Sequence, residues 1–202
     1  LNNEGRGKSL GTFKGDDKIL TIYSSGHFKL SGFELTTKFD DDLLQIEKWY
    51  PNRPLSCVYF NGDKEIFYVK RFLIESTLKK TLFIPESSKS ELTIASTQYL
   101  PKVNIEFNKR LKETKDLIDK VENLNDLIDV KGMKAQGNQL TRLKVKEIYL
   151  LPVAEGEGWP VEQELEEEVI QKVVEISDDK INKKNSEVIG TVNEDKSVEI
   201  EI

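Results

Sequence analysis

The stretch LSCVYFNGDKEIFYVKRFLI, residues 55–74, contains two apolar runs on either side of a short polar turn. Residues 55–60 and 65–74 are rich in valine, isoleucine and aromatic side chains, which favour β-strands. Between the two runs, Asn61 and Gly62 both tolerate the positive φ that a type I′ hairpin turn requires. The stretch predicts a β-hairpin, and an all-β fold if the same pattern recurs along the chain.

The pattern does recur. Residues 18–23 and 27–30 flank a turn at Gly26, and further strands are predicted at residues 81–84, 91–95, 103–107 and 144–151. Many short strands with turn signals are typical of a sandwich, barrel or propeller. A Gly-Asp pair precedes a β run at Gly15 and again at Gly62, and this weak repeat favours propeller-like blades. Residues 109–128 are charged and predict one or two helical turns or a mobile loop.

Charge divides the chain into two expected regions. The net charge of the 202 residues is −6, yet residues 151–202 hold 15 acids and 5 bases, whereas residues 1–150 hold 21 acids and 25 bases. We expect a mildly basic β-rich region at residues 1–154. We expect an acidic tail at residues 155–202, partly disordered or helical, with a terminal strand at residues 198–202.

The composition also bears on the cellular setting. No run approaches the ~20 apolar residues of a membrane span, and a single cysteine, Cys57, fits a reducing cytoplasm. Because the chain starts at Leu1 and its only methionine is Met133, we expect it to be a fragment of a longer polypeptide.

Few residues are available for catalysis. His27 is the only histidine, and Cys57 lies in an apolar run where a buried hydrophobic role is the usual one. The three consecutive aspartates at residues 40–42 lack the spaced ligands of a cation site. We therefore expect no catalytic, cofactor-binding or metal-binding residues, which disfavours a hydrolase or a nucleotide enzyme and favours a binding function.

Two groups of basic residues are candidates for binding DNA. Lys70 and Arg71 stand at the end of a strand beside aromatic residues, and Lys131, Lys134 and Arg142, with Lys144 and Lys146, surround Gly132 and Gly137. Lysine and arginine contact phosphates without reading sequence. Ordinary solvated positions explain the same residues equally well.

The motif Ile128-Asp-Val-Lys-Gly-Met-Lys-Ala-Gln-Gly-Asn-Gln-Leu140 resembles the blade motif in the C-terminal domain of the DNA-cleaving (A-type) subunits of bacterial type IIA topoisomerases, DNA gyrase and topoisomerase IV. Gly132, Ala135, Gly137 and Leu140 fit that motif. Residues 16–75, including Gly26-His-Phe-Lys29 and Tyr68-Val-Lys-Arg-Phe-Leu-Ile-Glu75, look like the corresponding topoisomerase IV subunits of the Bacteroides and Flavobacterium group. Topoisomerase IV is preferred over gyrase because the glutamine-, arginine- and glycine-rich box of gyrase has no match.

The resemblance implies a β-pinwheel of about three propeller-like blades, possibly an incomplete ring. In such a domain the motif at residues 128–140 forms a blade hairpin, its glycines allow tight turns or close backbone approach, and a basic outer rim binds and bends double-stranded DNA. We add Lys29 to the candidate DNA contacts on this ground.

The resemblance also implies a setting for the domain. The domain is non-catalytic and presents DNA for ATP-dependent strand passage, an isomerase reaction that controls DNA topology and chromosome segregation. ATP, Mg²⁺, the catalytic core and the separate ATPase (B-type) subunit belong to the rest of a bacterial, cytoplasmic, chromosome-associated enzyme. The alternative is a β-rich protein-interaction module whose acidic tail recruits a basic partner.

Overall fold

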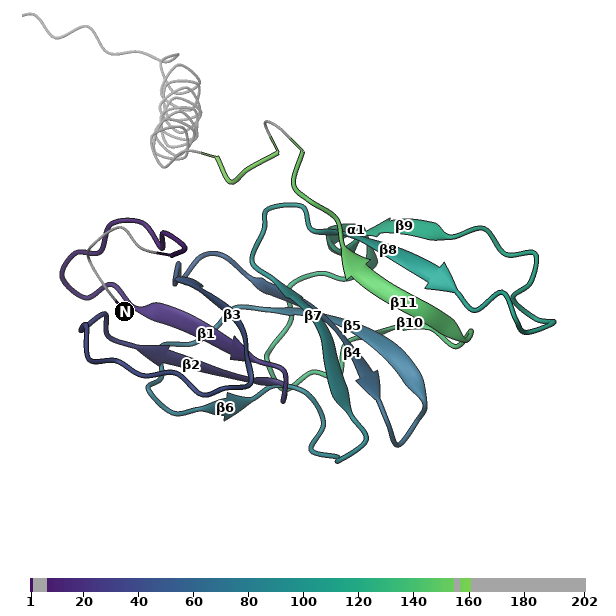
Figure 1. Ribbon diagram of the computed structural model, residues 1–202, viewed down its shortest axis with the longest axis horizontal. Helices are drawn as coiled ribbons and strands as arrows, with labels where there is room; N and C mark the ends of the chain where they lie inside the picture. The colour runs from purple at the N-terminus through teal and green to yellow at the C-terminus, as the bar shows by residue number, and fades with distance from the viewer. Residues whose placement is uncertain (2–6, 155–156, 161–202) are drawn as a thin grey trace, which may run out of the picture. The chain divides into compact units, whose positions relative to one another are not determined.

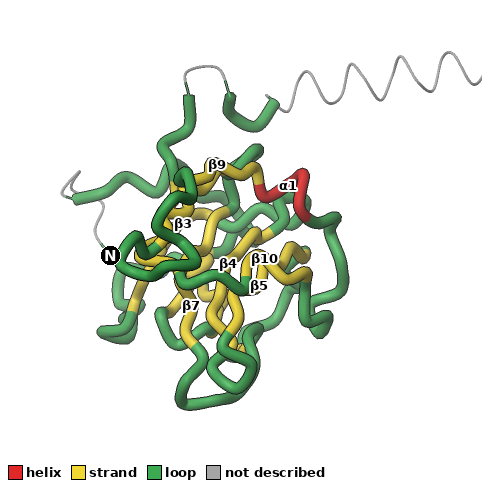
Figure 2. Tube along the Cα trace, turned by 90° about the vertical axis from the view of Figure 1, so that its right-hand side faces the viewer, coloured by secondary structure: helices red, strands yellow, loops and turns green. Residues whose placement is uncertain are grey.

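The strands of this domain are short, and each neighbouring pair among the described residues is antiparallel. The computed structural model (Figure 1) describes residues 1, 7–154 and 157–160. Within them lie eleven strands and one short helix, whose bounds are Ile19–Tyr23 (β1), His27–Ser31 (β2), Leu43–Lys48 (β3), Leu55–Asn61 (β4), Ile66–Phe72 (β5), Thr81–Leu82 (β6), Glu91–Ser96 (β7), Lys102–Phe107 (β8), Lys120–Asn123 (β9), Leu124–Leu127 (α1), Asn138–Thr141 (β10) and Val145–Leu150 (β11). Strands thus dominate and the helix is a single turn, as Figure 2 shows by colour.

The chain separates into two units, Leu1–Gly158 and Trp159–Ile202. All eleven strands of the described residues belong to the first unit. The predicted linker and terminal strand of the acidic tail lie outside the described residues, apart from the short stretch before residue 161. No helix in the described part of the chain is long and apolar enough to cross a membrane.

The strands form three antiparallel sheets, which we call blades 1, 2 and 3. Their orders are β3-β1-β2-β6, β10-β5-β4-β7 and β11-β8-β9. Three sheets of this kind confirm the predicted all-β, blade-like fold.

Each of the first two blades is completed by a strand from later in the chain. After the β4–β5 hairpin of blade 2, the chain returns to blade 1 as β6 and comes back to blade 2 as β7. After β8 and β9 of blade 3, it returns to blade 2 as β10 and comes back as β11. The fold therefore repeats by topology, with β1, β4 and β8 in one equivalent position and β2, β5 and β9 in the next.

Blade 2 is buried on both faces. One hydrophobic cluster joins Phe28 and Leu30 of blade 1 to Cys57 and Phe72 of blade 2. A second cluster packs the opposite side of blade 2, including Val58 and Val69, against blade 3. The run Leu55–Asn61 consequently has six of its seven residues buried, which explains its nearly continuous apolar sequence.

Several predicted strands are confirmed, and two local interpretations are wrong. The type I′ turn at Asn61 and Gly62 is replaced by a longer connection in which Glu65 has the positive φ, 54°, and the Asn61 side chain accepts hydrogen bonds from the amides of Asp63 and Lys64. The Gly-Asp repeat also pairs strands that are not equivalent, because Gly15 precedes β1 whereas Gly62 precedes β5.

The region at residues 109–128 contains one helical turn, within the one or two that the sequence predicted, and the remainder of the region is turns and a short strand. Its only regular helix is α1, whose first turn is capped by the side chain of Asn123, which accepts from the amide of Asn125 at 3.0 Å. Residues 108–119 form turns that connect β8 to β9. The strand β9 itself was not predicted, because its four residues carry little apolar character.

Candidate nucleic-acid interface

The six predicted DNA contacts fall into three environments. Lys131, Lys134 and Arg142 are exposed, Lys29 is half-buried, and Lys70 and Arg71 are buried. Since a phosphate contact needs an accessible cation, the environment of each group decides what it is able to reach.

Arg71 lies on β5 and ties two other segments to it. Its Nε donates to the hydroxyl of Ser56 on β4 at 3.1 Å, and its Nη1 donates to the carbonyl oxygen of Ile128 at 3.2 Å. The backbone continues the same link, because the Lys131 amide donates to the Arg71 carbonyl at 2.9 Å. Burial lowers the pKa of the guanidinium. Through its hydrogen bonds, Arg71 holds the returning segment against blade 2.

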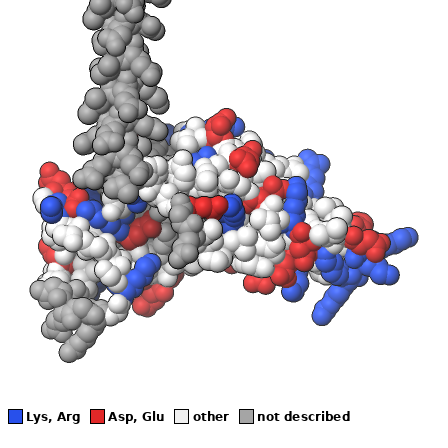
Figure 3. All heavy atoms as spheres, turned by 90° about the horizontal axis from the view of Figure 1, so that it is seen from above, with Lys and Arg blue, Asp and Glu red and all other residues white. Residues whose placement is uncertain are grey.

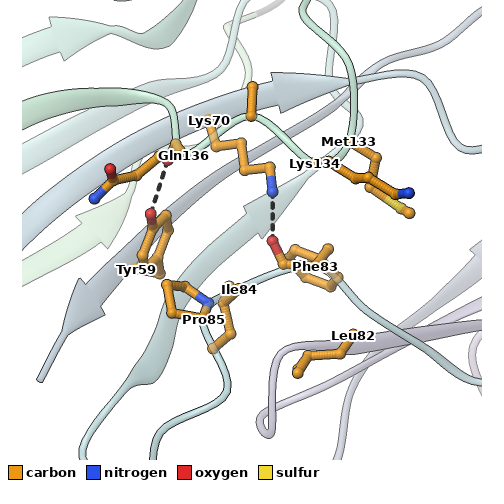
Figure 4. A pocket seen from close by; sticks show the side chains of 10 residues that line it. Tyr59, Lys70, Leu82, Phe83, Ile84, Pro85, Met133, Lys134 and Gln136 are labelled. Atoms are coloured by element: carbon orange, nitrogen blue, oxygen red, sulfur yellow. Dashed lines mark hydrogen bonds between the residues drawn. The ribbon is translucent and has the colours of Figure 1, made fainter. Parts of the chain in front are cut away.

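Lys70 forms a comparable link toward blade 1. Its Nζ donates to the Phe83 carbonyl oxygen at 2.5 Å, just beyond β6, and burial lowers the pKa of this ammonium group. Figure 4 shows this bond beside the one from the Tyr59 hydroxyl to the Gln136 carbonyl, 2.7 Å long. The cavity that these residues line measures about 340 Å³ and is also bordered by Lys134.

Lys29 is the counterpart of Lys70 in blade 1. Phe28 pairs with Thr81 of β6, and Val69 pairs with Asn138 of β10, so the residues that follow, Lys29 and Lys70, occupy equivalent positions. Lys29 is only half-buried, and its charge helps to lower the pKa of the nearby Asp40 carboxyl, after the larger effect of the hydrogen bond from Lys80.

The segment that carries Lys131 and Lys134 crosses between blades, so the interpretation of residues 128–140 as a blade hairpin is wrong. The preceding strand β9 belongs to blade 3, whereas β10 belongs to blade 2. Gly137 has a φ of +91° and lies against the Val69 carbonyl, where a Cβ atom would collide. Gly132 faces open space and serves a turn that the Ala135 amide closes on the Gly132 carbonyl at 2.9 Å. Of the two roles expected of these glycines, the tight turn occurs at Gly132 and the close backbone approach at Gly137.

A further set of basic residues gathers at one end of blade 3. This blade-3 tip comprises the β8–β9 loop at residues 108–119 and the β10–β11 turn at residues 142–144, which touch where the Asn108 amide donates to the Lys144 carbonyl at 3.0 Å. Figure 3 shows Lys and Arg side chains projecting at the end of the molecule where, in Figure 1, this loop lies.

The basic side chains of the tip differ in their partners. Lys109 pairs with Asp119 at 2.9 Å, Lys146 next to the tip pairs with Glu106 at 2.6 Å, and the Arg142 Nε donates to Gln139. Four exposed side chains have no hydrogen-bond or ion-pair partner among the described residues, and we call them the free tip bases: Arg110, Lys112, Lys115 and Lys144. These four are able to meet phosphates without first breaking an internal contact.

Sequence reasoning included Lys144 in a basic cluster but missed the other three free tip bases. The signal was the segment Lys109-Arg-Leu-Lys-Glu-Thr-Lys115, which places four bases within seven residues. The acids among and after them concealed it, because Glu113, Asp116 and Asp119 lower the local net charge. The structure distinguishes these charges, since Asp119 is already paired whereas three of the bases are free.

The residues considered for chemistry lie in ordinary surroundings. The Nδ1 of His27 contacts the Ser25 hydroxyl at 3.2 Å. Complete burial raises the pKa of the Cys57 thiol to about 12. Asp40 is hydrogen-bonded to Lys80 at 2.7 Å, and Asp42 accepts from Ser25 at 2.8 Å. No group of three or more possible metal ligands occurs among the described residues.

Comparison with known proteins gives one family. The family model described as topoisomerase C-terminal domain, Bacteroidota, matches residues 1–152, the range that contains all three blades. None of the curated proteins matches the chain significantly.

Proposed function

The chain belongs to the family of Bacteroidota topoisomerase C-terminal domains, and from this premise we propose that it binds duplex DNA for a type II topoisomerase. We propose further that its parent is the DNA-cleaving (A-type) subunit, that of topoisomerase IV rather than of gyrase. The domain is then an accessory part of the enzyme, and strand cleavage takes place elsewhere in the parent protein.

The free tip bases are the observation that supports DNA binding. Four exposed cations on two adjoining loops form a surface that a polyanion is able to approach from solvent. Each phosphate that such a residue neutralises releases counterions, so that binding strengthens as salt is lowered. Contacts of this kind position the duplex and do not read its sequence.

Further contacts would extend this surface along the domain. Lys131 and Lys134 are exposed on the segment before β10, and Arg142 is exposed at the tip itself; a duplex that contacts all of them in addition to the free tip bases is proposed to bend on the domain. Bending of this kind costs on the order of 1–6 kcal/mol and is offset by the added phosphate contacts. Lys70, Arg71 and Lys29 remain predicted contacts, and their buried or half-buried positions make them the weaker candidates.

The remaining parts of the activity belong to the proposed parent enzyme. We place ATP, Mg²⁺, the catalytic core and the ATPase (B-type) subunit there, in the bacterial cytoplasm at the chromosome, with no cofactor bound by this segment. The domain would hold one DNA duplex near the core and so raise its local concentration for strand passage.

The test is a titration of the full chain against a short linear duplex at several salt concentrations. The logarithm of affinity should fall linearly with the logarithm of salt, with a slope of ~0.9 for each neutralised phosphate. Affinities should be similar for unrelated sequences, and energy transfer between dyes at the duplex ends should increase on binding if the DNA bends. No binding at low salt would overturn the proposal and favour the protein-interaction module instead.

A further inference from the structure

Within the part of the chain that the structure describes, blade 3 has three strands where blades 1 and 2 have four. The second strand of each blade is covered in the first two cases, β2 by β6 and β5 by β10. The equivalent strand of blade 3, β9, has no neighbour on its outer side among the residues that the structure describes. An uncovered edge presents unpaired N–H and C=O groups that are able to pair with another strand.

The register shows which backbone groups face outward. Asn123 pairs with Lys102, which places Leu124 opposite Pro101, and the Leu124 amide donates to the Pro101 carbonyl at 2.9 Å. Hydrogen-bonded and non-hydrogen-bonded pairs alternate along an antiparallel ladder. Lys120 and Glu122 therefore bond toward β8, whereas Val121 directs both its N–H and its C=O away from the blade.

The charged side chains at this edge are complementary to those of a second copy of the same strand laid antiparallel to it. Val121 is 56% exposed, and Lys120 and Glu122 flank it on the opposite face of the strand, where they form an ion pair with each other. When Lys120-Val121-Glu122 is laid antiparallel to a copy of itself, each lysine meets a glutamate. A parallel arrangement in register would place like charges beside each other, which is unfavourable.

We propose that β9 is an interface for a second copy of this chain, paired antiparallel about a two-fold axis at Val121. The two Val121 residues exchange their outward N–H and C=O groups as a hydrogen-bonded pair. Lys120 then lies opposite the second copy's Glu122, and Glu122 opposite the second copy's Lys120, in the non-hydrogen-bonded positions where side chains come closest. The contact is isologous, as a two-fold interface requires.

Charge at the tips is compatible with this pairing. The β8–β9 loop precedes β9, so antiparallel pairing places the two basic tips at opposite ends of the shared edge. Lysine on an edge strand usually discourages association, but here the two-fold arrangement supplies a glutamate for each lysine. The second copy thereby supplies blade 3 with the fourth strand that blades 1 and 2 take from their own chain.

Sedimentation velocity of the full chain at increasing concentration tests the proposal. We expect a reversible rise from 23.2 kDa toward twice that mass. Lys120→Glu and Glu122→Lys should each remain monomeric alone, because like charges then face each other across the axis. An equimolar mixture of the two variants should associate, and so should the double variant, since both restore opposite charges at every facing position.

A backbone variant provides an independent test. Val121→Pro removes the outward N–H but no hydrogen bond to β8, so the blade should keep its circular dichroism spectrum and melting temperature while the dimer is lost. A wild-type chain that stays monomeric at every concentration would overturn the proposal, as would single charge variants that dimerise like wild type. A Val121 amide protected from exchange in the monomer, and exposed on removal of residues 161–202, would assign the edge to another strand of the same chain instead.

Discussion

Two basic regions of this domain, the pair on β5 and the tip of blade 3, differ in what surrounds them. Lys70 and Arg71 lie between blades and donate to Phe83, Ser56 and Ile128. The free tip bases extend into solvent from two loops. The same residue types thus hold the fold together in one place and remain available to a ligand in the other.

This difference has a physical origin in the position of blade 2. Because blades 1 and 3 pack on its two faces, both adjacent residues of β5 are buried although strand geometry points them to opposite sides. Buried cations need hydrogen-bond acceptors inside the protein, and the carbonyls of the returning segments provide them. A cation on a loop of an end blade has no such constraint.

The largest expected effect tests the tip. Replacing the four free tip bases together with serine should weaken DNA binding by roughly 100-fold at low salt, about 2.7 kcal/mol, and make the salt dependence shallower by ~0.9 for each lost phosphate contact. Fluorescence anisotropy at several salt concentrations measures both quantities. A matched control removes four exposed lysines elsewhere, Lys14, Lys38, Lys79 and Lys89. Equal losses in the two variants would mean that net charge, and not the tip, determines affinity.

Arg71→Ala should mainly affect folding. The substitution leaves the Ile128 carbonyl and the Ser56 hydroxyl without their donor, and we expect the free energy of unfolding to fall by about 2–3 kcal/mol. Urea unfolding gives this value, and DNA titration below the transition should give nearly the wild-type affinity. A tenfold loss of affinity at unchanged stability would restore Arg71 as a DNA contact and break the comparison.

Gly137→Ala should loosen the strand that covers β5. The alanine would have to adopt a φ of +91° and place its Cβ against the Val69 carbonyl, and we expect a destabilisation of about 2 kcal/mol. Gly132→Ala is the matched control because its Cβ would enter open space, and it should leave the urea midpoint nearly unchanged. Equal midpoints for the two variants would show that β10 tolerates displacement at Gly137.

Lys70→Met should have the smallest effect, about 1 kcal/mol, since the Phe83 carbonyl loses a donor while the burial of an ammonium group is avoided. Burial lowers the pKa of Lys70 in the native state below its ordinary 10.5. Between these two values the unfolded chain binds more protons than the native one, so Lys70 makes wild-type stability rise with pH there. The Met variant should lack this increment in urea unfolding across that window. Parallel pH profiles for the two proteins would contradict the assignment.

Local sequence predicted most strands but not their exchange between blades. Val58, Val69 and Ile94 lie in β-branched runs that specify strands wherever they pack. The return of β6 and β10 to an earlier blade depends on pairing over long sequence separations, for which a single sequence carries no signal. Two of the four residues of β9 are charged, so the β-propensity of this strand is low, and its pairing with β8 stabilises the extended conformation.

The candidate interface was predictable only in part. The exposed Lys131, Lys134 and Arg142 were named from their proximity to two glycines. The burial of Lys70 and Arg71 was not foreseeable from charge, because it depends on which blades flank β5. Arg110, Lys112 and Lys115 are hard to recognise from sequence because Glu113, Asp116 and Asp119 offset their charge in a count along the chain, although Asp119 is already paired with Lys109.

The return of β6 and β10 also determines when each blade becomes complete during synthesis. Blade 1 lacks its last strand until Thr81 and Leu82 have left the ribosome, long after His27–Ser31. Blade 2 waits in the same way for Asn138–Thr141. A ribosome that pauses between these points carries an unfinished sheet with an open edge, which is prone to pairing with other chains. Each of the first two blades is therefore completed only after two strands of the next blade have been synthesised.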